Sequence, residues 1–247
     1  MTAKSSILSL ANLHIISVVL YAGLAVLAGM LMQPLSYGVT SSYLTNDTFL
    51  STDKTVFVTA SRPLFDLEIR WALVGLLALS AVLPVLYLTK LKANYAKALK
   101  DGVWALRWIE TAVAAAIMIE IVGLLVGHSD IMMLKLMSGL VAITAGLCWL
   151  AERQKGTFVF GLLTAALPWL VIASTMLHTV LYGAVRSPWF VYGATFALLA
   201  GFILTAKNLR GKLPGGKNFE GAERNHVIIS LLTKVAFSVV LIVGLAK

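Results

Sequence analysis

The chain has 247 residues, of which 59% are hydrophobic and 13% are charged, and its formal net charge is +9. Soluble globular proteins contain roughly 45–50% apolar residues, so this composition excludes a soluble globular protein and indicates an integral membrane protein. Despite the positive charge we expect no nucleic-acid partner, because the basic residues are gathered in alternate connections between apolar runs.

Seven apolar runs are each long enough to cross a hydrocarbon layer of about 30 Å, which takes about 20 helical residues. The first is too long for a signal-peptide core and no small-residue cleavage pattern follows it, so we expect it to stay attached as a spanning helix. The sequence predicts an all-α membrane protein in which residues 1–247 form one domain. Its transmembrane helices are expected at 7–31, 67–89, 103–127, 131–150, 157–183, 188–206 and 226–246.

The basic residues predict the orientation of these helices. Twelve of the 20 lysines and arginines fall in the N-terminal segment and the connections between runs 2 and 3, 4 and 5, and 6 and 7, whereas six fall on the opposite side. Because cytoplasmic connections carry the excess of lysine and arginine, we expect a protein of the cell membrane with a cytoplasmic N-terminus and an extracellular C-terminus.

The connection at 33–66 is the one long connection on the extracellular side. Strand-forming residues are frequent at 37–44 and 54–60, and Thr45-Asn46-Asp47 interrupts them. This pattern predicts a β-hairpin that lies across the outer face.

Lys234 is the one charged residue inside the seventh run. A free ammonium in hydrocarbon costs at least about 2.5–3.5 kcal/mol, which makes such a lysine a candidate functional residue. One interpretation is that its side chain extends to the nearest interface, but it lies eight residues inside the run, about 12 Å at 1.5 Å per residue. The other is a desolvated amine, which is the group that condenses with an aldehyde to form a Schiff base.

Glu110 in the third run is the acid expected at the depth of Lys234. The third and seventh runs start on the same side, and Glu110 and Lys234 lie seven and eight residues from those starts, within roughly 2 Å of one another in depth. Glu120 lies ten residues deeper and about 80° round the helix from Glu110. For Glu120 two interpretations are open: it lines a polar cavity on the outer side, or it is a neutral carboxyl group.

Three more polar residues are expected at this depth, namely His14, Ser80 and Ser230. Ser230 precedes Lys234 by one helical turn and so shares its face. Taken singly, each is compatible with ordinary packing, because an intramembrane serine commonly bonds the carbonyl four residues earlier. Together they indicate a polar site to which four helices contribute.

These features resemble the heliorhodopsins, a family of retinal-binding rhodopsins with inverted topology. Arg107-Trp108-Ile109-Glu110 is similar to the family's counterion segment, and Glu223-Arg224 with the string Ile228 to Lys234 is similar to its Schiff-base segment. Pro168-Trp169, Ser80-Ala81 and the long first outer loop also fit. The resemblance spans nearly the whole chain.

The resemblance implies that Lys234 binds all-trans retinal covalently as a protonated Schiff base and that Glu110 is the counterion. Ser80, Ser230 and His14 would belong to the surrounding polar network. For the chromophore wall we expect Met118, Trp169 and Phe196, with ordinary helix packing as the alternative. One position departs from the family, which often has a second histidine in the second helix where this chain has Pro84.

The function expected from the resemblance is that of a light sensor, with no enzymatic activity and no metal site. Outward pumps carry carboxylates at the positions that correspond here to Ser230 and Ile121. The expected partners are membrane lipids, a second copy of the chain paired through the outer-loop sheet, and an unknown cytoplasmic signalling partner. Two alternatives remain: a light-gated or light-driven ion path supported by Arg107 and Glu120, and a transporter or scaffold without retinal in which Lys234 and Glu110 form a structural ion pair.

Overall fold

The computed structural model describes residues 3–46, 57–102, 104–152, 154, 156–183, 186–210 and 219–246. Among these residues seven helices are long and apolar enough to span a membrane, which confirms the predicted helical membrane fold. They are α1 (Ala3–Leu31), α2 (Ile69–Leu88), α4 (Ala105–Leu125), α5 (Ile131–Ala151), α6 (Thr157–Tyr182), α7 (Trp189–Arg210) and α8 (Phe219–Gly244).

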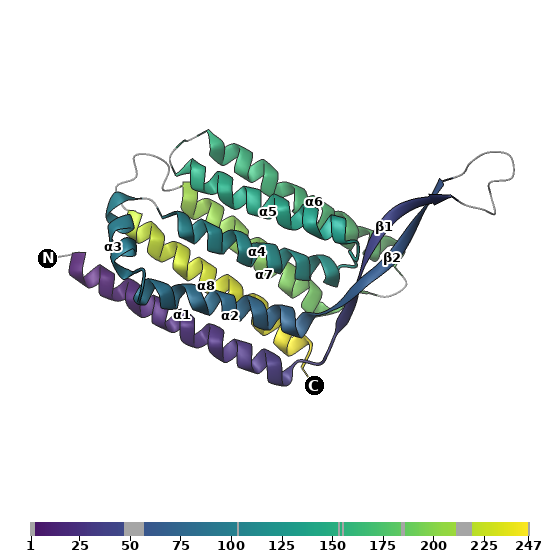
Figure 1. Cartoon of the computed structure of the whole chain (residues 1–247), viewed down its shortest axis with the longest axis horizontal. Coiled ribbons are helices and arrows are strands. Elements are labelled where there is room, and N and C mark those ends of the chain that lie inside the picture. Colours follow the sequence, from purple (N-terminus) through teal and green to yellow (C-terminus); the bar gives the residue numbers. More distant parts are fainter. Residues whose placement is uncertain are drawn as a thin grey trace.

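The seven long helices form one bundle (Figure 1). In it α1 packs on α2 and α8, α4 packs on α2, α5 and α7, and the pairs α5–α6 and α7–α8 complete the arrangement. The buried core joins large apolar side chains from several helices, among them Leu73, Ile119 and Phe237. The outward faces are apolar too: Leu163 and Leu170 of α6 are 62% and 65% exposed. A helix that is apolar on all sides requires a nonpolar surrounding, as a membrane provides.

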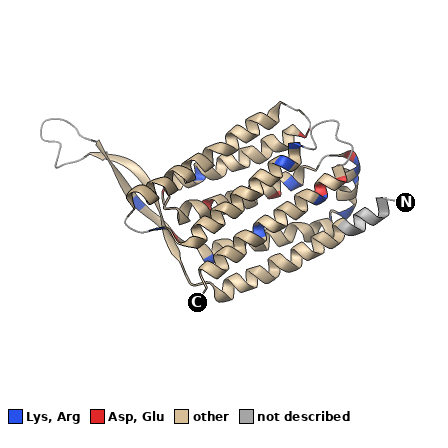
Figure 2. Cartoon of the chain, turned by 180° about the vertical axis from the view of Figure 1, so that it is seen from behind, with Lys and Arg blue, Asp and Glu red and all other residues tan. Residues whose placement is uncertain are grey.

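The bundle has two distinct ends, which Figure 1 shows at its left and right. The first, called the α3 end, carries the N-terminus and the short helix α3 (Lys92–Asp101). The second, called the hairpin end, carries the C-terminus and the strands β1 (Ser36–Asn46) and β2 (Phe57–Glu68). Figure 2 shows that most of the charged positions gather at the α3 end, with few along the middles of the helices.

The predicted β-hairpin is present and antiparallel, and it projects beyond the bundle (Figure 1). Val39 pairs with Phe65 and Thr40 pairs with Pro63, so Leu64 is an extra residue that forms a bulge. A bulge is a position where a proline, which has no N–H to donate, is tolerated within a strand. The connection between the strands, 47–56, lies outside the described residues, as does part of the predicted 54–60 strand.

Asp130 attaches the hairpin to the start of α5. The backbone N–H of Ser42 donates to Asp130 Oδ2 at 2.8 Å, and the N–H groups of Met132 and Met133 donate to Oδ1 at 2.8 and 3.3 Å. Asp130 is therefore the N-cap of α5 and also an acceptor for β1. Hydrogen bonding from Ser42 first, and then from the two methionines, holds the pKa of Asp130 below its ordinary value.

Two segments differ from the sequence-based expectation. Residues 92–101 were expected as a connection but form α3, whose one apolar face is too short to register as a spanning run. The seventh run was expected to begin at residue 226, whereas α8 begins at Phe219. The additional turns contain Glu220, Glu223 and Arg224, and charged residues lower the hydropathy on which the expectation rested.

Asp130→Ala is expected to lower the thermal unfolding midpoint of the purified protein, because α5 loses its cap and β1 loses an acceptor. A carboxyl group with a lowered folded-state pKa stabilises the fold above its ordinary pKa of about 3.9, and this stabilisation is lost as the pH falls through the lower value. The difference between Asp130→Ala and wild type should therefore be full at neutral pH and vanish in acid. Asp101→Ala, at the exposed end of α3, is the control, and an equal loss there would contradict the assignment.

Candidate functional site

Lys234 of α8 and Glu110 of α4 form an ion pair inside the bundle. Lys234 is 4% exposed, and its Nζ also lies 5.4 Å from the centre of the Tyr21 ring. A buried charge is tolerated when a partner of opposite charge is held against it. The structure thus brings together the two residues that the sequence analysis placed at one depth, although α8 begins one to two turns earlier than expected.

An apolar cavity of about 110 Å³, lined in part by Lys234, lies between α4, α7 and α8. Its walls include Ala115, Met118, Leu198 and Phe202. A second cavity of about 50 Å³ shares Ala115, Leu198 and Phe202 and continues to Trp169 of α6. An amine that lines an apolar cavity, with one carboxylate beside it, is the set of groups that a long apolar aldehyde requires, so these residues fit retinal.

Of the three residues expected in the chromophore wall, Met118 and Trp169 line these cavities and Phe196 does not. Phe196 is 73% exposed on the outer surface of α7. Phe202 of the same helix faces the cavities instead. At about 100° per residue, the step of six positions from Phe196 to Phe202 turns the two side chains to different faces. The sequence alone did not specify which face of this uniformly apolar helix is turned inward.

A polar cavity of about 30 Å³ lies on the other side of the ion pair. It is lined by residues of α1, α2, α4 and α8, among them His14, Pro84, Glu110, Glu223 and Ser230. This volume is enough for about one water molecule. Ser80, the remaining residue expected in the polar network, is 1% exposed, and its Oγ has no hydrogen-bond partner among the described residues.

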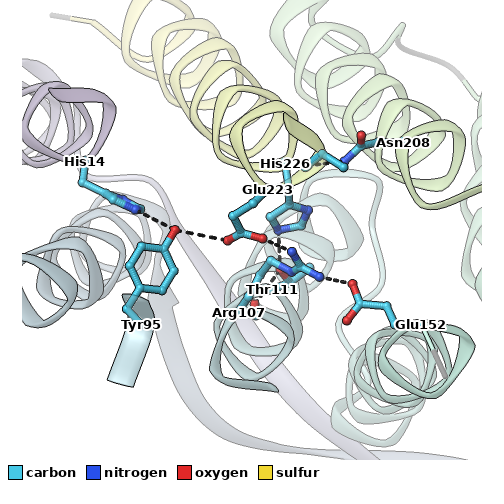
Figure 3. Close-up of polar contacts among 9 residues, drawn as sticks. His14, Tyr95, Arg107, Thr111, Glu152, Asn208, Glu223 and His226 are labelled. Carbon is cyan, nitrogen blue, oxygen red and sulfur yellow. Dashed lines mark hydrogen bonds and ion pairs between the residues drawn. The ribbon is translucent and has the colours of Figure 1, made fainter. Parts of the chain in front are cut away.

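Arg107 is the centre of a second buried ion cluster, nearer the α3 end (Figure 3). Its guanidinium group, 2% exposed, pairs with Glu223 of α8 and with Glu152, which directly follows α5. Tyr95 of α3 donates to Glu223 at 3.4 Å, and His14 Nε2 lies 3.1 Å from the Tyr95 hydroxyl. The cluster therefore ties α4, α5 and α8 together and connects them to α3 and α1.

The sequence analysis did not identify Glu152, Glu223 and Tyr95 as members of a site. The signal that could have found the carboxylates is Arg107 itself, because a guanidinium within an apolar run requires anionic partners. Glu152 and Glu223 lay outside the expected spans, in segments interpreted as connections. Tyr95 carries no comparable signal, since it comes from a helix that was not expected.

Glu120, for which two interpretations were open, pairs with Lys135 of α5 at 2.9 Å. It lines a largely apolar cavity of about 320 Å³ at the hairpin end. The Lys135 side chain is 62% exposed and that of Glu120 is 25% exposed. Glu120 is therefore paired with a basic side chain and also borders a cavity.

Among the described residues, no group of three or more His, Cys, Asp or Glu side chains could hold a metal ion.

In the comparison with protein families, the model described as Heliorhodopsin matches residues 8–245, nearly the whole chain. No curated protein matches the sequence.

The buried Arg107 cluster and the exposed Glu120–Lys135 pair should contribute differently to the free energy of unfolding. Arg107→Leu leaves the carboxylates of Glu152 and Glu223 buried without their cation, and the free energy of unfolding should fall by about 3–5 kcal/mol. Lys135→Ala removes an exposed partner and should cost less than about 1 kcal/mol. Denaturant titration of both variants in the same detergent measures the difference. Similar losses would show that the Arg107 cluster is no more important to stability than the surface pair.

Proposed function

The chain belongs to the heliorhodopsin family, a family of rhodopsin-type retinal light receptors, and on that premise we propose that Lys234 binds all-trans retinal as a protonated Schiff base with Glu110 as its counterion. We further propose that the absorbed light is used for sensing and not for net ion transport.

The observation that carries the retinal site is that Lys234 lines the apolar cavity and forms an ion pair with Glu110. Retinal supplies absorption of visible light and a double bond that isomerises. Lys234 anchors it, and Glu110 balances the positive charge on the lysine nitrogen. Met118, Trp169 and Phe202 confine the polyene and exclude water from it.

The sensing role is supported by the residues at two positions where a pump would carry acids. Ser230, one turn before the lysine, and Ile121 in α4 stand where a pump would carry carboxylates. Arg107 and Glu120, the two residues that could support an ion path, are each held in ion pairs. The alternative, a light-driven or light-gated proton path, is favoured by the polar cavity that extends from Glu110 to Glu223.

The orientation and the output surface follow from the charge distribution. The α3 end carries Lys90, Lys92, Lys97 and Lys100, and the positive-inside rule assigns that end to the cytoplasm. In this orientation the hairpin end is extracellular, where exposed Leu44 and Phe57 of the two strands would meet a second copy of the chain. A signalling partner would bind at the α3 end, and lipids would cover the apolar outer faces.

Lys234→Ala should express and insert but remain colourless after incubation with retinal, because it lacks the amine that forms the Schiff base. Absorption spectra of the purified protein, recorded before and after treatment with hydroxylamine in the light, test this prediction. Lys135→Ala, which removes an exposed lysine, should bind retinal normally. A wild-type protein with no visible band would overturn the retinal site and leave Lys234 and Glu110 as a structural pair.

Glu110→Gln should shift part or all of the pigment to a blue-absorbing deprotonated form at neutral pH, because the positive charge on the Schiff base loses its one paired carboxylate. Any pigment that stays protonated should absorb further to the red. Spectra recorded during a pH titration measure both effects, and Glu120→Gln serves as the matched control. If Glu120→Gln shows these spectral shifts and Glu110→Gln does not, Glu120 is the counterion.

Voltage-clamped cells that express the pigment should show no sustained photocurrent at any holding potential or pH gradient, since Ser230 and Ile121 stand where a pump would carry carboxylates. A current that reverses with the proton or chloride gradient would identify a channel, and one that persists against the gradient would identify a pump.

A further inference from the structure

The cavity of about 320 Å³ at the hairpin end, here called the hairpin-end cavity, is lined by residues of α2, α4, α5 and the two strands. The polar cavity that Glu110 lines measures only about 30 Å³. Protein interiors are closely packed, with few voids larger than a water molecule, whereas sites for small molecules measure roughly 300–1,000 Å³. The size of the hairpin-end cavity therefore indicates a binding site.

The chemistry of the lining selects an apolar ligand. Glu120 and Lys135 are the only lining residues with polar side chains. The others are aliphatic or aromatic apart from Gly75, and they include Phe65 of β2 and Trp71 of α2. A polar ligand would lose its hydration here with few groups to replace it.

The free space in the cavity lies beside α2. The helices α4 and α5 are in close contact at Gly123, where an added Cβ would lie 2.7 Å from Met137 Cε. At Gly75 of α2 an added Cβ would meet no atom of the described residues within 4 Å. A glycine in the wall of the cavity thus leaves room that any larger side chain would occupy.

The lining residues of the helices all lie within one half of the membrane. Ile117 is eight residues before the end of α4, Gly75 is six residues after the start of α2, and Lys135 is four residues after the start of α5. At 1.5 Å per residue, the deepest of these positions is about 12 Å from the hairpin end of its helix. Half of a hydrocarbon layer is about 15 Å thick, so the cavity belongs to a single leaflet.

The cavity reaches the outer surface of the bundle, because Trp71 and the Lys135 side chain are 57% and 62% exposed. The Arg70 guanidinium lies 5.0 Å from the centre of the Trp71 ring. Tryptophan and arginine are common where a helix leaves the hydrocarbon layer. Lys135 donates one N–H to Glu120, and its ammonium group has two further N–H groups for an anion.

We propose that the hairpin-end cavity binds one acyl chain of a phospholipid from the adjacent leaflet and that Lys135 binds the phosphate of this lipid. The lining, the confinement to one leaflet and the exposed ammonium match the chain, the position and the charge of such a molecule. The cavity shares no lining residue with the cavities that Lys234 and Glu110 line, so this inference does not rest on the retinal site.

The bound chain would pack against a helix that also forms the proposed chromophore wall. Ile117 of α4 lines the hairpin-end cavity, and Met118, the next residue, lines the apolar cavity that includes Lys234. Because a ligand that binds only the folded state stabilises it by mass action, the lipid should raise the thermal unfolding midpoint of the protein.

The test uses Trp71 as the reporter. Phosphatidylglycerol with brominated acyl chains is titrated at low mole fraction into the full-length protein in maltoside micelles, and bromine quenches the fluorescence of a tryptophan that it contacts. The difference between wild type and Trp71→Phe isolates the signal of Trp71. This signal should be quenched in a saturable way, and an excess of unbrominated phosphatidylglycerol should restore it. Quenching that only rises linearly with the lipid fraction would overturn the proposal without any variant of the cavity.

Gly75→Leu fills the cavity, and leucine is also a better helix former than glycine. The saturable quenching of Trp71 should weaken at least tenfold in this variant, and added lipid should no longer raise the unfolding midpoint. Gly146→Leu in α5 is the matched control, because an added Cβ there also meets no atom of the described residues within 4 Å and Gly146 does not line the cavity. Equal binding in the two variants would contradict the site.

Lys135→Gln tests the phosphate contact. This variant should bind brominated phosphatidylglycerol about tenfold more weakly, the effect of one hydrogen bond to a charged group. Brominated diacylglycerol, which has the same chains and no phosphate, should bind the variant and wild type equally. Lys97→Gln, at the α3 end, is the control for total charge. An equal loss for both lipids, or an equal loss in both variants, would overturn the role of Lys135.

One further outcome would assign the hairpin-end cavity to another occupant. If Trp71 shows no saturable quenching and Gly75→Leu converts a dimer into monomers in light scattering, the cavity receives a second copy of the chain and the lipid proposal is wrong. A wild-type protein that binds the brominated lipid but forms no pigment with retinal refutes the proposed function alone, so the two failures are distinguishable.

Discussion

The requirement that every charge inside the bundle be paired determines how this molecule is built. Lys234 is surrounded by hydrocarbon side chains, where an isolated ammonium would be costly, and Glu110 offsets that cost. Lys234 lines an apolar cavity, and Glu110 lines a smaller one with several polar side chains. The two members of the ion pair thus border different cavities, of which the apolar one suits a chromophore.

The Arg107 cluster extends the same principle toward the α3 end. One guanidinium group with two carboxylates leaves the cluster with a net negative charge if all three are ionised, and Tyr95 supplies a further donor to Glu223. Because these partners come from four different elements, a change of charge at one of them alters the contacts of all. Arg107 and Glu223 of this cluster also line the cavity that borders Glu110.

The hairpin end is built differently. Its ion pair, Glu120 with Lys135, is partly exposed, and the hairpin is attached mainly through backbone hydrogen bonds to residues at the start of α5. Exposed pairs contribute little to stability. The two ends of the bundle thus differ. The cavity that Glu110 lines is also lined by Arg107 and Glu223, whose cluster reaches α3, whereas no described ion pair connects Lys234 to the hairpin.

The sequence by itself determined the number and the approximate limits of the spanning helices, the hairpin, and the pairing of Lys234 with Glu110, because hydropathy, strand propensity and depth are properties of a linear chain. Only the tertiary structure decided that Phe202 and not Phe196 faces the cavity, because the sequence of a helix that is apolar on all sides does not indicate which face is buried. It also decided that Glu152, Glu223 and Tyr95 surround Arg107. Such partners lie at the ends of helices distant in sequence, and their proximity arises from the packing of the bundle alone.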